Sequence, residues 1–156
     1  GEDVKFIARR MIILASEDIG NANPTALVIA NNTFQAVSCV GNPESRIILS
    51  QCAIYLACSE KSNSAYIAIN KAQQKVEETG NLSVPLKIRN ASTKLMKELG
   101  YGENYKYAHN FNNNFADQEF MPESIKGLKF YKPGNNLREN VQREFLKKNW
   151  KDKYNY

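Results

Sequence analysis

Apolar residues over the first 80 positions recur at the three- and four-residue intervals that place them on one face of a helix. Glycines at positions 20, 41 and 80 separate these segments, and glycine commonly ends a helix. Glu2 with Asp3, Asn23 and Asn42 stand where helices would begin, and each of the two asparagines is followed by a proline suited to a first turn. The pattern predicts four consecutive helices joined by short turns, and hence antiparallel neighbours.

The third and fourth segments differ in how their apolar residues are distributed. Residues 46–58, RIILSQCAIYLAC, are apolar on nearly every face. An exposed helix keeps a polar side, so this segment is predicted to be either the central helix or one shared with another subunit. Residues 64–79 instead carry Tyr66, Ile69 and Val76 on a single stripe.

After residue 80 the helical period is interrupted by an extended connector. A short helix capped by Asn90 or Ser92 follows, with Leu95 and Leu99 predicted to face inward. Residues 101–136 show no helical period. An irregular stretch of this length is either functional or wrapped tightly onto helices.

The last segment, residues 137–153, is predicted to be an amphipathic helix. Glu139 with Arg143, and Glu144 with Lys148, are spaced for favourable ion pairs on its surface. The inward face is predicted to hold Leu137, Val141, Phe145 and Leu146. The fold class is therefore all-α: an antiparallel helical bundle, an aromatic-rich irregular segment and a C-terminal amphipathic helix.

Chain length and charge distribution indicate one domain whose two halves differ in charge. A chain of 156 residues is the size of one domain, here predicted as a four-helix core in 1–80 and a basic region in 81–156. The formal net charge is +5, yet residues 82–156 carry 14 basic and 8 acidic side chains whereas the first 81 carry 7 and 8. An anionic partner is expected to contact the second half.

The cysteines and the short apolar runs indicate the cellular compartment in which the protein is expected. Cys39, Cys52 and Cys58 are odd in number and lack C-x-x-C spacing, so they are predicted to be reduced, buried core residues of a cytosolic protein. No apolar run approaches the roughly 18 residues of a membrane span, so no membrane partner is expected.

Catalytic residue types are scarce. His109 is the single histidine, which makes metal hydrolases and nucleophile triads hard to assemble. No phosphate-binding G-x-x-x-x-G-K-[ST] loop occurs, and GYGENYKY at 100–107 lacks the third glycine of a dinucleotide fingerprint. The sequence predicts no catalytic, metal or cofactor site within these residues.

Two constellations remain as candidate binding sites. Basic residues around the short helix and on the last helix are candidate phosphate contacts, and the alternative is a solvated basic face. The candidates are Lys87, Arg89, Lys94, Lys97, Arg143, Lys147 and Lys148. Aromatic rings also alternate along an extended segment, at Tyr105, Tyr107, His109 and Phe111. This row could stack bases, although such rings more often cover a helical core as a lid.

Four long motifs carry a resemblance to one family. They are FIARRMIILASEDIGNANPTAL at 6–27, IYLACSEKSNSAY at 54–66, VPLKIRNASTKLMKELGYGENYKYAH at 84–109 and QEFMPESIKGLKFYKP at 118–133. Together they resemble the C-terminal third of the replication-associated recombination protein A group, RarA or MgsA. These are AAA+ ATPases related to clamp loaders, with a eukaryotic Werner-helicase-interacting relative.

The resemblance implies a function that composition does not. It implies an all-helical domain similar to a clamp-loader collar, which assembles a homotetramer of a DNA-dependent ATPase acting at stalled forks and gapped DNA. ATP and magnesium would bind the upstream ATPase core. The expected partner is single-stranded or forked DNA in the cytoplasm or nucleoid, and docking of single-strand-binding protein here is left open.

Two other hypotheses stand beside this one. The chain could be a free-standing helical nucleic-acid-binding protein that uses its basic C-terminal half. A subunit contact through residues 46–58 would favour the oligomerisation module, and a monomer at high concentration would favour the alternative. A small-molecule enzyme would require a well-formed pocket that holds His109 beside a perturbed acid.

Overall fold

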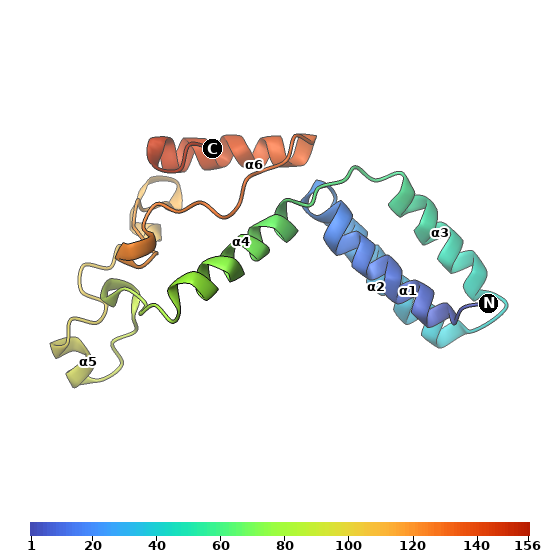
Figure 1. Cartoon of the computed structure of the whole chain (residues 1–156), viewed down its shortest axis with the longest axis horizontal. Coiled ribbons are helices and arrows are strands. Elements are labelled where there is room, and N and C mark those ends of the chain that lie inside the picture. Colours follow the sequence, from blue (N-terminus) through green and yellow to red (C-terminus); the bar gives the residue numbers. More distant parts are fainter. The chain divides into compact units, whose positions relative to one another are not determined.

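The computed structural model describes residues 1–156 and contains α-helices, short 3₁₀ turns and no β-strand (Figure 1). The all-α class predicted from the sequence is confirmed. The helices are α1 (Val4–Leu14), α2 (Thr25–Val40), α3 (Ser45–Ala57), α4 (Ser64–Thr79), α5 (Lys94–Glu98) and α6 (Leu137–Trp150). Contacts divide the chain into two compact units, Gly1–Lys71 with Phe130–Glu144 and Ala72–Lys129 with Phe145–Tyr156.

The first helix begins and ends where its residues predict. The Asp3 carboxylate accepts hydrogen bonds from the backbone amides of Lys5 and Phe6, at 2.7 and 3.0 Å, and thereby caps α1. After Leu14 the α-helix continues as a single π-helical turn, Ala15–Ile19. The spacing of the apolar residues did not predict this turn. The helical path then ends through Gly20 at a positive φ of 48°.

Asn23 does not cap α2, contrary to the prediction. Its side-chain amide donates instead to the hydroxyls of Tyr55 and Ser59, at 3.0 and 3.1 Å, and α2 begins two residues later. Tyr55 lies on α3 and Ser59 just after it, so this amide ties the start of α2 to the end of α3. A long-range partner has replaced the local one that the Asn-Pro pattern favours.

The core of the first unit is built around α2, which packs against both α1 and α3. Small residues on its buried face let the helices approach closely. The buried cluster comprises Ala15, Ile19, Ala26, Ala30, Cys52 and Leu56. Of the two alternatives predicted for α3, the central position is wrong, because Ile47 and Ile54 on its opposite side are 60% and 64% exposed, and a contact with another subunit stays a prediction.

The cysteines differ in environment. Cys52 is buried in the core, whereas Cys39 and Cys58 are exposed, so the prediction of three buried thiols holds only for Cys52. Cys39 lies in the last turn of α2 and Cys58 follows the end of α3.

Gly20 is the glycine at which a side chain meets the greatest obstacle in the first unit. A Cβ there would lie 2.5 Å from the carbonyl oxygen of Ser62, and the φ of 48° is itself unfavourable for other residues. We expect Gly20→Ala to lower the free energy of unfolding by about 3 kcal/mol, measured by urea denaturation. Gly41→Ala is the control, because Gly41 has φ +73° but open space around it and should cost only about 1–2 kcal/mol. Equal losses for the two variants would contradict the steric explanation.

The second unit has few regular elements and buries little of its short helix. Thr93, rather than Asn90 or Ser92, caps α5 by accepting a hydrogen bond from the amide of Met96 at 3.2 Å. Leu95 and Leu99 are 63% and 55% exposed, so the predicted inward face of this helix is wrong. One turn of helix is too short to present a buried stripe.

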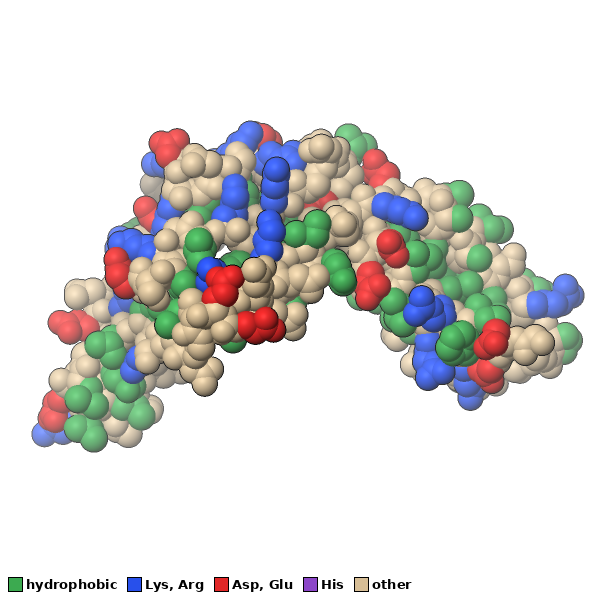
Figure 2. Space-filling view, in the orientation of Figure 1, with side chains coloured by type: hydrophobic (Ala, Val, Ile, Leu, Met, Phe, Trp, Pro, Cys, Tyr) green, Lys and Arg blue, Asp and Glu red, His purple; other side chains and the backbone are tan.

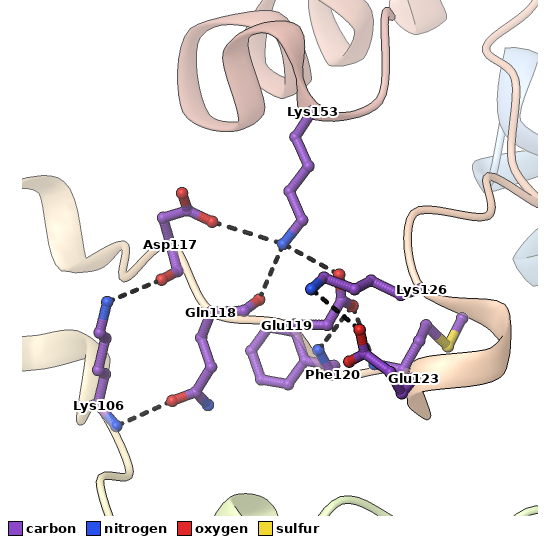
Figure 3. Close-up of polar contacts among 9 residues, drawn as sticks. Lys106, Asp117, Gln118, Glu119, Phe120, Glu123, Lys126 and Lys153 are labelled. Carbon is purple, nitrogen blue, oxygen red and sulfur yellow. Dashed lines mark hydrogen bonds and ion pairs between the residues drawn. The ribbon is translucent and has the colours of Figure 1, made fainter.

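Aromatic and charged contacts hold the irregular segment against the end of the chain. The rings of Phe115 and Tyr154 meet Trp150 edge-on, with centroids 4.8 and 5.1 Å away. The Lys153 ammonium lies over the Trp150 ring. It also lies 3.4 Å from the Glu119 carboxylate (Figure 3). Burial would raise the pKa of Glu119, but backbone amides and this ammonium outweigh it and lower that pKa. Here the irregular chain is wrapped onto the C-terminal helix, one of the two predicted alternatives.

Candidate interaction surfaces

The start of α6 is organised by an asparagine and a buried glutamate. The Asn136 side chain accepts a hydrogen bond from the Glu139 amide at 2.9 Å and donates to the Glu139 carboxylate at 2.6 Å. This is a side-chain cap of the helix N-terminus, with the acidic residue at the third helical position. Glu139 has no exposed surface.

The Glu139 carboxylate is bound by donors from separate segments of the first unit. The hydroxyl of Ser64, at the start of α4, and that of Tyr131 both donate to it, the latter at 2.9 Å. Burial alone would raise its pKa, but hydrogen bonds from Ser62, Ser64 and Asn136 outweigh it and lower the pKa of Glu139 to about 2. Burial and the adjacent carboxylate raise the pKa of Tyr131 to about 12. The site is therefore an ionised carboxylate that links α4 and α6.

Burial of Glu139 fixes the rotation of α6 and turns its apolar side outward. Leu137, Val141 and Phe145 follow one another at four-residue intervals and are 79%, 72% and 65% exposed. The predicted inward face is wrong for these three residues, because a hydrogen-bonded carboxylate occupies the inward position instead, whereas Leu146 is half-buried. We call these three residues the α6 stripe.

A second exposed apolar row runs along α3. Ile47 and Ile54 lie seven residues apart, on the side of the helix opposite the buried Cys52 and Leu56. We call these two isoleucines the α3 stripe. Figure 2 shows hydrophobic side chains at the surface over α3. Neither stripe is covered by other residues of the chain, which is the arrangement expected of surfaces that meet another molecule.

Arg89, a predicted phosphate contact, holds its own loop together. Its guanidinium donates to the carbonyl of Val84 at 2.6 Å and to the hydroxyl of Tyr101 at 3.1 Å, and lies 5.0 Å from the centroid of the Tyr101 ring. These contacts close the connector onto the segment that follows α5. Arg89 therefore has a structural role in the second unit.

Arg143 also has structural partners. Its guanidinium donates to the carbonyls of Pro133 and Gly134, at 2.7 and 2.6 Å. The predicted Glu139–Arg143 ion pair is wrong, because Glu139 faces inward while Arg143 fixes the chain that leads into α6. Arg143 belongs to the first unit, whereas the other six predicted phosphate contacts belong to the second.

The predicted lysines are only partly brought together. Lys94 lies 3.9 Å from Glu98 in an exposed pair, and Lys97 is exposed one turn away. Lys87 is half-buried in a 3₁₀ turn, while Lys147 and Lys148 lie on α6. A role for these residues in phosphate binding stays a prediction.

The aromatic row is exposed rather than folded over a core. Tyr105 and Tyr107 are 52% and 54% exposed, and Phe111 is 42% exposed. A 3₁₀ turn at Ala108–Asn110 interrupts the extended segment and sets the rings of Tyr107 and His109 5.1 Å apart. The lid that the alternation most favoured is therefore not formed by these three rings.

Residues 1–156 contain no group of three or more His, Cys, Asp or Glu side chains able to hold a metal ion. None of the helices has the length and apolar content needed to cross a bilayer.

Comparison with known proteins decides the family. The model of the family described as "MgsA AAA+ ATPase C terminal" matches residues 1–150. The chain belongs to this family. It is 45% identical over 136 residues to replication-associated recombination protein A of Coxiella burnetii, which covers 86% of this chain and 31% of that protein.

Two further relatives are also much longer than this MgsA C-terminal region. An uncharacterized protein of Thermotoga maritima is 46% identical over 154 residues, covering 99% of this chain and 25% of the relative. ATPase WRNIP1 of Dictyostelium discoideum is 43% identical over 127 residues, covering 81% of this chain and 14% of the relative. The chain thus spans less than a third of each of these three proteins, and the resemblance inferred from its motifs is confirmed.

The sequence analysis did not identify the residues that orient α6 in this MgsA C-terminal region. Asn136 and Glu139 stand three residues apart before an apolar row, a spacing that identifies a capped helix start. That spacing could have placed the beginning of α6. Nothing local indicates that the carboxylate would be buried by Ser64, which lies 75 positions away.

Proposed function

We propose that this chain is the assembly region of a DNA-dependent AAA+ ATPase that acts in replication-associated recombination and repair at stalled forks. It joins subunits into a homotetramer in the manner of a clamp-loader collar, as one oligomerisation domain over residues 1–156. The family match over residues 1–150 and the names of the relatives support the ATPase and recombination context.

The observation that carries the assembly role is the pair of uncovered apolar stripes. On α6 and α3 the exposed fractions of the apolar side chains lie between 60% and 79%. Apolar area of this kind gains roughly 25 cal/mol for each Å² removed from water. A second copy of the chain supplies the same two stripes, and symmetric oligomers are built from such repeated surfaces.

The rest of the parent protein supplies the chemistry in this proposal. ATP and magnesium bind an ATPase core outside residues 1–156, in a cytoplasmic, nucleoid-associated protein. Single-stranded or forked DNA is the polymeric substrate, and single-strand-binding protein is a further partner. Lys87, Lys97 and Lys148 are the predicted residues that would contact the DNA phosphates in this proposal.

A second candidate function is favoured by one observation, the exposed aromatic row. Tyr105, Tyr107 and Phe111 present ring surface to solvent beside Lys106. Rings of this kind can stack on bases of a single strand, which suits a helical nucleic-acid-binding protein whose basic half is its whole function. A chain that binds single-stranded DNA while remaining a monomer would favour this alternative.

The proposal predicts how ATP hydrolysis depends on the assembly region. The 156-residue chain alone is expected to hydrolyse no ATP, because it lacks a phosphate-cradling loop with its magnesium ligand. The longer parent protein is expected to hydrolyse ATP faster with forked DNA, and to lose that stimulation when Val141→Glu and Ile54→Glu disrupt the two stripes. Phosphate release from ATP is the measurement. Unchanged stimulation in a fully dissociated variant would refute the proposed role of assembly.

A further inference from the structure

The first unit contains an open cavity of about 420 Å³ that three lysines line. Its walls come from the loop before α4, from the first two turns of α4 and from the segment that leads into α6. Each of these contributes one lysine, and amide side chains lie beside them. The residues relevant to binding are Lys61, Lys71, Lys132, Asn63 and Asn135.

The three lysines lack the ionic partners that other lysines of the chain have. Lys75, Lys94 and Lys126 each pair with a glutamate three or four residues away. No ion pair within residues 1–156 involves a cavity lysine, and no carboxylate lines the cavity. Like charges that converge without a counter-ion repel one another, so the site favours an anion.

The buried Glu139 carboxylate beneath one wall reduces this field without cancelling it. It lies against Gly134 and Ser64, which both line the cavity, and its low pKa keeps it negatively charged. Three lysines and the Arg143 guanidinium, which binds the Pro133 and Gly134 carbonyls, set against one carboxylate leave a net charge of +3 around the site. Glu60 precedes Lys61 on the same loop but does not line the cavity.

The walls of the cavity are held in place by buried contacts. A Cβ on Gly134 would lie 2.7 Å from a Glu139 carboxylate oxygen and 3.2 Å from the Ser62 hydroxyl, so the backbone is packed directly against this cluster. Arg143 binds the carbonyls of Pro133 and Gly134 from another direction. The site is therefore largely preformed, and little ordering cost opposes binding.

We propose that this cavity binds a phosphate group, through the ammonium groups of Lys61, Lys71 and Lys132 and the side-chain amides of Asn63 and Asn135. Ammonium and amide groups supply the hydrogen bonds that phosphate oxygens accept. The volume exceeds that of one phosphate and accommodates part of the molecule that carries it. The phosphate can belong to a nucleic-acid backbone or to a free phosphate ion. The site goes beyond the proposed assembly function and is formed within one subunit.

The test measures binding of two probes to the 156-residue chain. A fluorescein-labelled single-stranded oligonucleotide is followed by anisotropy over a salt series, and inorganic phosphate is titrated by calorimetry. The variant Lys61→Gln/Lys71→Gln/Lys132→Gln is expected to bind the recognised probe at least about tenfold more weakly. If that probe is the oligonucleotide, the slope of log affinity against log salt should be smaller by about 2–3.

Two matched proteins control for net charge and for folding. Lys5→Gln/Arg10→Gln/Arg46→Gln removes the same charge from exposed positions outside the cavity. The triple arginine replacement of the cavity lysines keeps the charge and should retain binding within about threefold. Thermal unfolding of each variant should match that of the unmodified chain, because all six positions are exposed.

Each outcome decides the proposal. If the cavity variant, in which glutamine replaces the three lysines, loses binding to both probes, the cavity is a site for the phosphate group itself. Loss of the oligonucleotide alone assigns the site to a nucleic-acid backbone, and loss of inorganic phosphate alone assigns it to the free ion. Binding of neither probe by the unmodified chain, or equal weakening in the cavity and control variants, overturns the proposal. If the chain is a monomer but still binds a probe, the assembly function fails while the phosphate site is retained, so the two proposals can be told apart.

Discussion

Glu139→Ala is expected to lower the free energy of unfolding by about 3 kcal/mol, because it removes the acceptor shared by several buried donors. The hydroxyls of Ser64 and Tyr131 and the amide of Asn136 would lose their bond to this carboxylate. The chain also loses a bond between α4 and α6. Urea denaturation measures the effect, and Glu60→Ala, at an exposed carboxylate, should change the free energy by less than about 0.5 kcal/mol.

The same carboxylate predicts an acid-sensitive stability. The pKa of Glu139 is about 2 in the folded chain and ordinarily 4.5, so the unfolded chain takes up its proton first as pH falls. Its contribution of about 3 kcal/mol is therefore present above pH 4.5 and is lost as pH falls toward 2. Glu139→Gln should show a smaller loss of stability over this pH window. An identical pH profile for the two proteins would show that Glu139 is not the group responsible.

Val141→Glu is expected to dissociate the assembled chain into monomers. The substitution places a charge in the middle of the α6 stripe, and a desolvated, unpaired charge costs several kcal/mol at each interface where it occurs. A symmetric oligomer carries the change in every subunit, which multiplies its effect. The folded subunit should be unaffected, because Val141 is 72% exposed.

Asn140→Glu is the matched control for this variant. It adds the same charge to the same exposed turn of α6, but its side chain points about 100° away from that of Val141. Sedimentation velocity should show monomers for Val141→Glu and unchanged assembly for Asn140→Glu. Assembly that survives Val141→Glu would remove the α6 stripe from the interface and leave the α3 stripe to be tested by Ile54→Glu.

The local features of the fold could be predicted from the sequence because they depend on local chemistry. Gly20, Gly41 and Gly80 end segments as predicted, since each adopts the positive φ that glycine tolerates. The Asp3 cap and the span of α4 follow from the same kind of reasoning. Long motifs gave the family, which the comparisons confirm.

The features that could not be predicted depend on contacts between distant residues. Asn23 leaves its capping position because Tyr55 and Ser59 offer partners over thirty residues away. The apolar period of α6 predicts a buried stripe, but Ser64 and Tyr131 hold its polar side inward. Periodicity identifies the two faces of a helix, but it does not say whether the apolar face is buried by the same chain or by another copy.

The partners of the basic residues likewise could not be predicted from the sequence. Arg89 and Arg143 belong to a pattern that favours phosphate contact, yet each guanidinium binds carbonyl groups of its own unit. The lysines of the cavity, Lys61, Lys71 and Lys132, are scattered along the sequence and form no cluster in it. Only folding brings them to one site.

The mass of the unmodified chain in solution tests the central claim most directly. Multi-angle light scattering at tens of micromolar should give the mass of four chains of 17.7 kDa each, because uncovered apolar stripes on α3 and α6 meet those of other copies. A mass of 17.7 kDa at every concentration would contradict the proposal that this region assembles the protein.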